Sequence, residues 1–147
     1  MKSLPRAALA ALCLLTAAPA QAETFCEAFK PVVESGTAPQ PWLKIRGGQI
    51  DSLLWKSTAM LPGFAKCQIA PASHDYSCDV TNLTADKVAA LEASTKASLE
   101  ACLGSPMVRD ATIVGNPWTW RPEPGAFPLI ILYNLRDGIS FVFLPRG

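Results

Sequence analysis

The fold of this chain is decided by residues 64–104, which read FAKCQIAPASHDYSCDVTNLTADKVAALEASTKASLEACLG. A turn at residues 71–74 places Cys67 directly opposite Cys78 in an antiparallel pair. Side chains alternate between the two faces of a strand, so this register also puts Ile69 on the same face as both cysteines. The stretch therefore predicts a hairpin with one apolar and one polar face.

A helix is predicted directly after the hairpin. Thr84 is a suitable N-cap, Asp86 places negative charge in the first turn, and Gly104 is a suitable C-terminal cap. Apolar and small residues recur every three or four positions between these ends, which is the spacing of one helix face. The inward face is expected to contain Val88, Leu91, Thr95, Leu99 and Cys102.

The N-terminus has the features of a secretory signal peptide. Lys2 and Arg6 precede an apolar run at residues 7–18, and Ala20-Gln21-Ala22 fits an A-x-A cleavage signal. The run is too short for a permanent membrane anchor. We expect a signal peptide at residues 1–22 and one mature domain at residues 23–147, located in the periplasm or secreted.

Four cysteines remain after this cleavage, and an even number in an exported chain indicates two disulfides. The hairpin register favours Cys67 with Cys78, which leaves Cys26 to pair with Cys102 on the inward face of the helix. The alternative pairs Cys78 with Cys102 and Cys26 with Cys67. There is no C-x₂-C motif, so neither a metal site nor another cofactor is predicted.

Cleavage would also change the charge balance. It removes two of the 13 Lys and Arg residues and none of the 12 Asp and Glu residues. The mature chain is close to neutral, which argues against nucleic acid or an anionic membrane as the main partner.

The rest of the chain predicts an α+β fold with a mostly antiparallel sheet of about six strands. Three strands precede the principal helix and three follow it, and residues 25–33 form a short N-terminal helix that Pro31 limits. The strand-rich stretches on either side of the principal helix are compatible with a degenerate repeat. Beyond the first hairpin, strands are expected at residues 50–60, 107–114, 129–135 and 139–144.

The last two predicted strands are apolar on both faces, so both faces must be covered. One interpretation is that the principal helix covers one face, while the N-terminal helix or residues 118–128 cover the other. The alternative is that one face binds a partner, either a second copy or another envelope protein.

Residues 118–128 are the strongest candidate for a binding segment because aromatic residues and prolines alternate in them. Tryptophan anchors many protein interfaces, and proline keeps a loop rigid, so little entropy is lost on binding. The candidate binding residues are Trp118, Trp120, Arg121, Glu123 and Phe127.

Candidates for catalysis are few. The single histidine, His74, lies at the hairpin turn, and no Gly-x-Ser-x-Gly elbow is present. The paired acids Glu92 and Glu100 are spaced for general acid and base roles but are expected on a solvated helix face. No catalytic residue is therefore predicted, and Glu123 is the acid in the most cleft-like context.

Residues 61–103 carry Leu61-Pro62-Gly63, then Cys67, Tyr76-Ser77-Cys78 and Cys102-Leu103. This pattern resembles small exported proteins of Gram-negative bacteria that have no established activity. The resemblance implies export and a disulfide-paired hairpin, and it implies no functional residues.

These observations favour a non-enzymatic binding protein of the cell envelope, of the inhibitor or immunity type. A small envelope hydrolase using Glu123 and a purely structural exported module are the alternatives.

Overall fold

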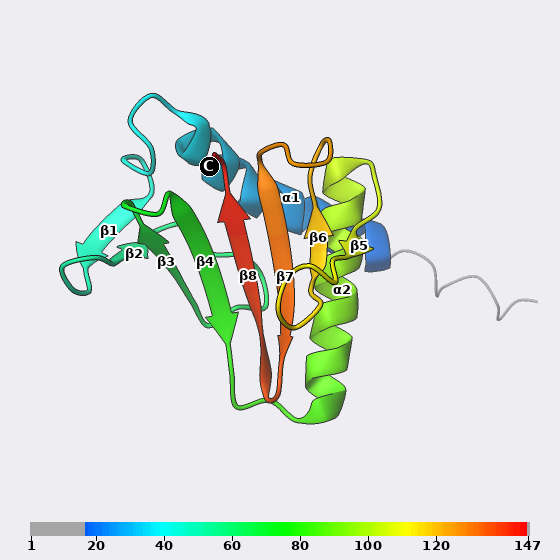
Figure 1. The fold of residues 1–147 in the computed structure, drawn as a ribbon. Helices are drawn as coiled ribbons and strands as arrows, with labels where there is room; N and C mark the ends of the chain where they lie inside the picture. The colour runs from blue at the N-terminus through cyan, green and yellow to red at the C-terminus, as the bar shows by residue number, and fades with distance from the viewer. Residues whose placement is uncertain (1–16, 147) are drawn as a thin grey trace, which may run out of the picture.

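A computed structural model describes residues 17–146 of the chain. Most of the predicted signal peptide, residues 1–16, lies outside the described residues, and the last part of it begins the first helix. Within residues 17–146 the chain forms two helices and one antiparallel sheet of eight strands, which confirms the α+β class (Figure 1). The elements are α1 (Ala17–Thr37), β1 (Arg46–Gln49), β2 (Trp55–Ser57), β3 (Lys66–Ala70), β4 (Asp75–Val80), α2 (Ala85–Leu103), β5 (Val108–Arg109), β6 (Trp118–Trp120), β7 (Leu129–Leu135) and β8 (Gly138–Leu144).

The strands lie in the order β1-β2-β3-β4-β8-β7-β6-β5. The chain twice forms a helix followed by four strands, and the last strands of the two halves, β4 and β8, pair at the centre of the sheet (Figure 1). The predictions of about six strands, and of three on each side of α2, were wrong. Strand β1 was missed because its Gly47-Gly48 pair has low strand propensity, and β6 was missed because it is short and follows Pro117.

The two halves share a contact between an arginine and a tryptophan. The guanidinium carbon of Arg46 lies 4.6 Å from the ring centre of Trp55 in the first half. The guanidinium carbon of Arg109 lies 4.1 Å from the ring centre of Trp118 in the second half, with the same spacing along the chain. This contact and the shared order of one helix and four strands agree with the degenerate repeat suggested by the sequence.

The first hairpin has the predicted register, with Cys67 opposite Cys78 and Ile69 opposite Tyr76. Both predicted disulfides are present. The Cα atoms of Cys67 and Cys78 are 4.1 Å apart, and those of Cys26 and Cys102 are 5.4 Å apart. The second disulfide joins α1 to α2.

Helix α1 is longer than predicted, because Pro31 lies inside it without ending it. An interior proline removes a backbone hydrogen bond and costs about 3 kcal/mol. The helix continues past Pro31 because the side chains of Phe29, Val32 and Ser35 on either side of it are buried. This burial offsets the cost of the proline. Helix α2 has the predicted ends. The Thr84 side chain accepts a hydrogen bond from the Lys87 backbone N–H, and Gly104 is left-handed with φ 69°.

Both helices pack on the same face of the sheet, behind it in Figure 1. Phe29 of α1 makes edge-to-face contacts with Phe141 and Phe143 of β8, and Tyr76 of β4 adjoins Phe141. Trp42, in the connection after α1, is fully buried and stacks on Tyr76. The core therefore lies between the helices and one sheet face, and none of the helices formed by residues 17–146 lies on the opposite face.

Candidate binding surfaces

Two of the predicted binding residues, Trp118 and Trp120, point toward the helix side of the sheet. They lie in register with Leu132 and Ile130, which belong to the core. The indole N–H of Trp120 donates a hydrogen bond to Ser105 Oγ at 2.6 Å. Both side chains are half-buried, so they contribute mainly to packing in this structure.

The indole N–H of Trp118 donates a hydrogen bond to Oε1 of Glu92 on α2, at 2.7 Å. The same carboxylate accepts hydrogen bonds from Arg109, at 3.2 Å, and from the Asn134 side chain. The Lys96 ammonium lies 4.5 Å from the Trp118 ring centre. The Glu92 side chain is only 12% exposed, so the expectation of a solvated position was wrong. Its charge holds α2 against β5, β6 and β7.

Glu100 is the second acid that was expected on a solvated face, and it also accepts hydrogen bonds within the protein. It accepts hydrogen bonds from Lys96 at 2.6 Å and from the Met107 backbone N–H at 2.9 Å. The hydrogen bond from Lys96 is the main reason why the pKa of Glu100 lies below its ordinary value. Both acids therefore serve as acceptors for neighbouring donors.

The remaining predicted binding residues lie in the connection between β6 and β7. Arg121 forms an ion pair with Asp110 at 3.8 Å, which ties this connection to the one between β5 and β6. Hydrogen bonds from Thr112 are the main cause of the lowered pKa of Asp110. Glu123 is exposed, and Phe127 is 43% exposed. The predicted segment is thus split between the helix side of the sheet and an exposed loop.

The sheet face without helices carries apolar side chains over β7 and β8; we call it the helix-free face. Ile131 of β7 is opposite Val142 of β8 on this face, and Leu129 is opposite Leu144. Leu129 and Ile131 are buried apart from the main core, whereas Val142 and Leu144 are half-buried. Gly115, in the connection between β5 and β6, lies beside the ring of Tyr133 and covers part of this face.

The same face of β3 and β4 is polar. Gln68 is opposite Ser77, and Lys66 is opposite Asp79. Since Ser77 is also opposite Val142, the change from polar to apolar occurs between β4 and β8. Sequence reasoning found that the last hairpin is apolar on both faces, but it could not show that both helices would cover the same one.

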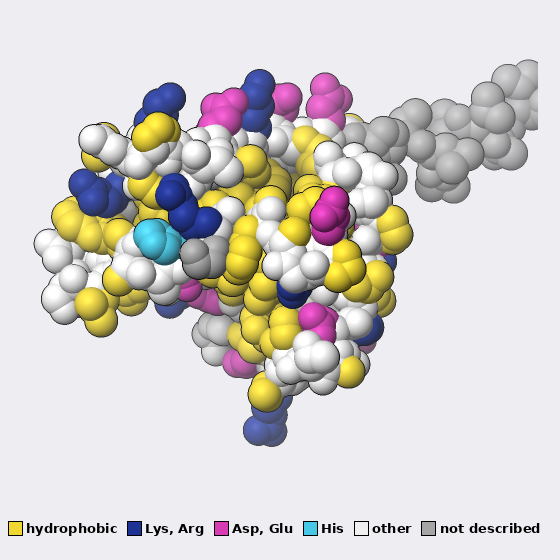
Figure 2. All heavy atoms as spheres, turned by 45° about the horizontal axis from the view of Figure 1, so that its top comes forward, with side chains coloured by type: hydrophobic (Ala, Val, Ile, Leu, Met, Phe, Trp, Pro, Cys, Tyr) yellow, Lys and Arg dark blue, Asp and Glu magenta, His cyan; other side chains and the backbone are white. Residues whose placement is uncertain are grey.

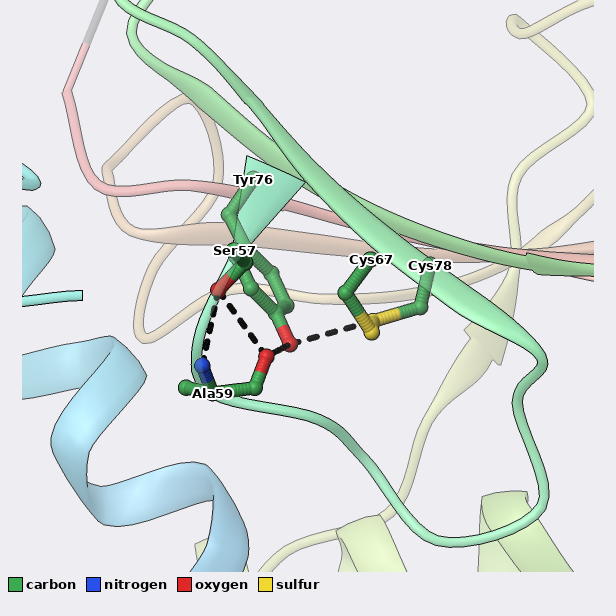
Figure 3. Close-up of a disulfide and its surroundings, with 5 residues drawn as sticks. All are labelled: Ser57, Ala59, Cys67, Tyr76 and Cys78. Atoms are coloured by element: carbon green, nitrogen blue, oxygen red, sulfur yellow. Dashed lines mark hydrogen bonds between the residues drawn. A yellow bond between two sulfur atoms is a disulfide. The ribbon is translucent and has the colours of Figure 1, made fainter. Parts of the chain in front are cut away.

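The disulfide between Cys67 and Cys78 is buried, and Ser57, Ala59 and Tyr76 lie around it (Figure 3). The Tyr76 hydroxyl donates a hydrogen bond to the Ala59 carbonyl at 2.9 Å, and its oxygen lies 3.1 Å from Cys78 Sγ. Ser57 Oγ donates to the same carbonyl. Burial raises the pKa of the Tyr76 hydroxyl well above its ordinary value. His74, on the nearby turn, is half-buried and has a positive φ of 59°.

Residues 17–146 contain no cluster of three or more His, Cys, Asp or Glu side chains that could hold a metal ion. They also contain no helix long and apolar enough to span a membrane. Comparisons with protein-family models, with curated proteins and with solved structures found no match.

Proposed function

We propose that the protein is a non-enzymatic binding module exported to the periplasm or secreted, and that it binds another cell-envelope protein, as an inhibitor or immunity-type partner would. The observation that supports this proposal is the apolar character of the helix-free face over β7 and β8. Val142 and Leu144 stay half-exposed there, and Val108 and Phe127 are 59% and 43% exposed at its margin. Exposed apolar side chains that lie together commonly mark an interaction surface.

The first half of the chain serves as an internal comparison. Its sheet exposes Gln68, Ser77 and Lys66 on the same face, so this sheet does not require apolar residues there in order to fold. The half-exposed Val142 and Leu144 of the second half therefore support a role in binding, whereas Leu129 and Ile131 are already buried within the protein.

The size of the surface favours a different protein over a second copy. Strands β7 and β8 have seven residues each and β6 has three, so together they cover roughly 270 Å² at about 3.3 Å per residue and about 4.8 Å between strands. A stable dimer usually buries about 800 Å² on each partner. A separate protein that also contacts the exposed loop around Glu123 and Phe127 would reach that area.

Export is supported by the two disulfides, which fit an extracellular or periplasmic protein. A compartment that keeps thiols reduced would not maintain them.

The test replaces Val142 with glutamate. This charge on the helix-free face should weaken a complex with a purified envelope partner at least tenfold, because the carboxylate would lose its hydration. Gln68→Glu is the matched control, since it places the same charge on the polar half of the face. Isothermal titration with both variants, each checked for a native circular dichroism spectrum, measures the effect.

Equal weakening by both substitutions, or by neither, would argue against this surface. A complex lost only when the exposed loop is changed, as in Phe127→Ser, would move the binding site to that loop.

A further inference from the structure

A second surface lies at the other end of the sheet. The β1–β2 lobe, residues 43–58, projects from the sheet edge at the left of Figure 1. Three large apolar side chains are exposed on it: Leu43 by 54%, Ile50 by 48% and Leu53 by 66%. Ile50 and Leu53 lie in the connection between β1 and β2, at the tip of the lobe. The lobe therefore exposes to solvent aliphatic side chains that are not part of the core.

The tip has a fixed backbone. Ile50 N–H donates to the Leu54 carbonyl at 2.9 Å. Asp51 Oδ1 accepts hydrogen bonds from the backbone N–H groups of Leu53, at 2.8 Å, and Leu54, at 2.9 Å. These hydrogen bonds fix the backbone of the tip, so little backbone entropy is left to lose when the exposed Leu53 side chain binds.

The charge of the lobe differs from that of the whole chain. Lys44, Arg46 and Lys56 are exposed, and Asp51 is the lobe's one acid. In Figure 2, Lys and Arg side chains lie among exposed apolar side chains at this end of the molecule. The net charge of the mature chain is close to zero, which argued against an anionic membrane. The lobe itself, however, carries an excess of positive charge.

We propose that the β1–β2 lobe binds peripherally to an anionic lipid surface, with Ile50 and Leu53 entering the headgroup boundary. Peripheral proteins combine exposed aliphatic residues with Lys and Arg in this way. Trp55, half-buried beneath Arg46, lies next to the tip, and tryptophan is enriched at membrane interfaces.

The placement of the cations favours lipid over an acidic protein. Arg46 lies over the Trp55 ring, whereas Lys56 follows Trp55 directly and so points to the opposite face of the strand. A lipid headgroup layer surrounds an inserted hairpin on both faces. A protein partner would contact one face.

The experiment is cosedimentation of the mature, disulfide-bonded protein with vesicles. Vesicles of equal parts phosphatidylglycerol and phosphatidylcholine are compared with vesicles of phosphatidylcholine alone. We expect binding to the anionic vesicles only, and weaker binding as salt is raised. Each cation removed should weaken binding about fivefold, so the double substitution Arg46→Gln with Lys56→Gln should weaken it roughly 25-fold. Leu53→Ser should also weaken binding.

Two matched controls keep the test specific. Val114 is 94% exposed on another loop, and Lys87 is exposed on α2, so Val114→Ser and Lys87→Gln should leave binding unchanged. Failure of the unaltered protein to bind anionic vesicles would overturn the proposal, as would equal losses in the control variants. Binding to immobilised polyglutamate without binding to vesicles would indicate an acidic protein and would also overturn it. The proposed partner site at Val142 is tested separately, because Val142 lies on β8, three strands away from β2 in the sheet.

Discussion

The Glu92 side chain connects α2 with the three strands β5, β6 and β7. Replacing it with alanine removes the acceptor of the half-buried Trp118 indole N–H and leaves Arg109 without its ion pair. Unsatisfied donors of this kind cost about 1–3 kcal/mol each. We expect Glu92→Ala to lower the free energy of unfolding by about 2–3 kcal/mol in urea titrations.

The control is Glu27→Ala, which removes an exposed acid from α1 and should change stability by less than about 0.5 kcal/mol. Equal effects of the two substitutions would show that the contacts of Glu92 are unimportant.

Glu100 should make the free energy of unfolding depend on pH in the acidic range. Its pKa in the folded protein lies below the ordinary value of 4.5, chiefly because Lys96 donates a hydrogen bond to it. Its contribution is therefore complete above about pH 4.5 and is lost as the pH falls through the folded-state pKa. Urea titrations over this range should show a smaller decline for Glu100→Gln than for the unaltered protein. An identical decline would contradict the assignment.

At this scale the sequence was most informative for the cysteines. The alternation of apolar residues around Cys67 and Cys78 allowed one register only, and the disulfide followed from it. The direction of Trp118 was beyond the sequence, because β6 has only three residues and so gives no alternation long enough to assign its faces.

At the scale of elements, the close packing of β4 and β8 depends on Gly138. An added Cβ there would collide with the carbonyl oxygen of Val80, which is backbone and cannot rotate away. We expect Gly138→Ala to destabilise the protein by about 1–3 kcal/mol or more, measured as a lower thermal midpoint. Gly48→Ala is the matched control, because its Cβ would meet nothing within 4 Å. A tolerated Gly138→Ala would mean that the two strands can separate at this point.

The elements predicted well were those whose signals are local. Helix α2 has an N-cap, a glycine C-cap and a periodic face, and all three belong to its own sequence. Helix α1 extended beyond its prediction because burial against β8 outweighed the effect of Pro31. Burial of this kind is decided by residues more than 100 positions away, so a local pattern cannot reveal it.

For the whole molecule, the disulfide between α1 and α2 should contribute most of the cross-linking stability. It closes a loop with a separation of 76 residues, against 11 for the hairpin disulfide. In the loop-entropy treatment these correspond to about 4.5 and about 3 kcal/mol. We expect Cys26→Ala with Cys102→Ala to lower the free energy of unfolding by about 4 kcal/mol. Native-like stability of this double variant would show that the packing of α1 is sufficient without the bond.

The assembly of the halves was the least predictable feature. The sequence indicated strands on both sides of α2, but the pairing of β4 with β8 joins two segments that have no sequence signal for each other. The helix-free face exists only because this pairing places both helices on one side.

The central claim is that the chain is exported and then closed by the disulfides Cys26–Cys102 and Cys67–Cys78. The most direct test is peptide mapping by mass spectrometry, under non-reducing conditions, of protein recovered from the producing cells. We predict an N-terminus at Glu23 and two cross-linked peptides with these pairings. Free thiols at the four cysteines, or an intact signal peptide, would contradict the account.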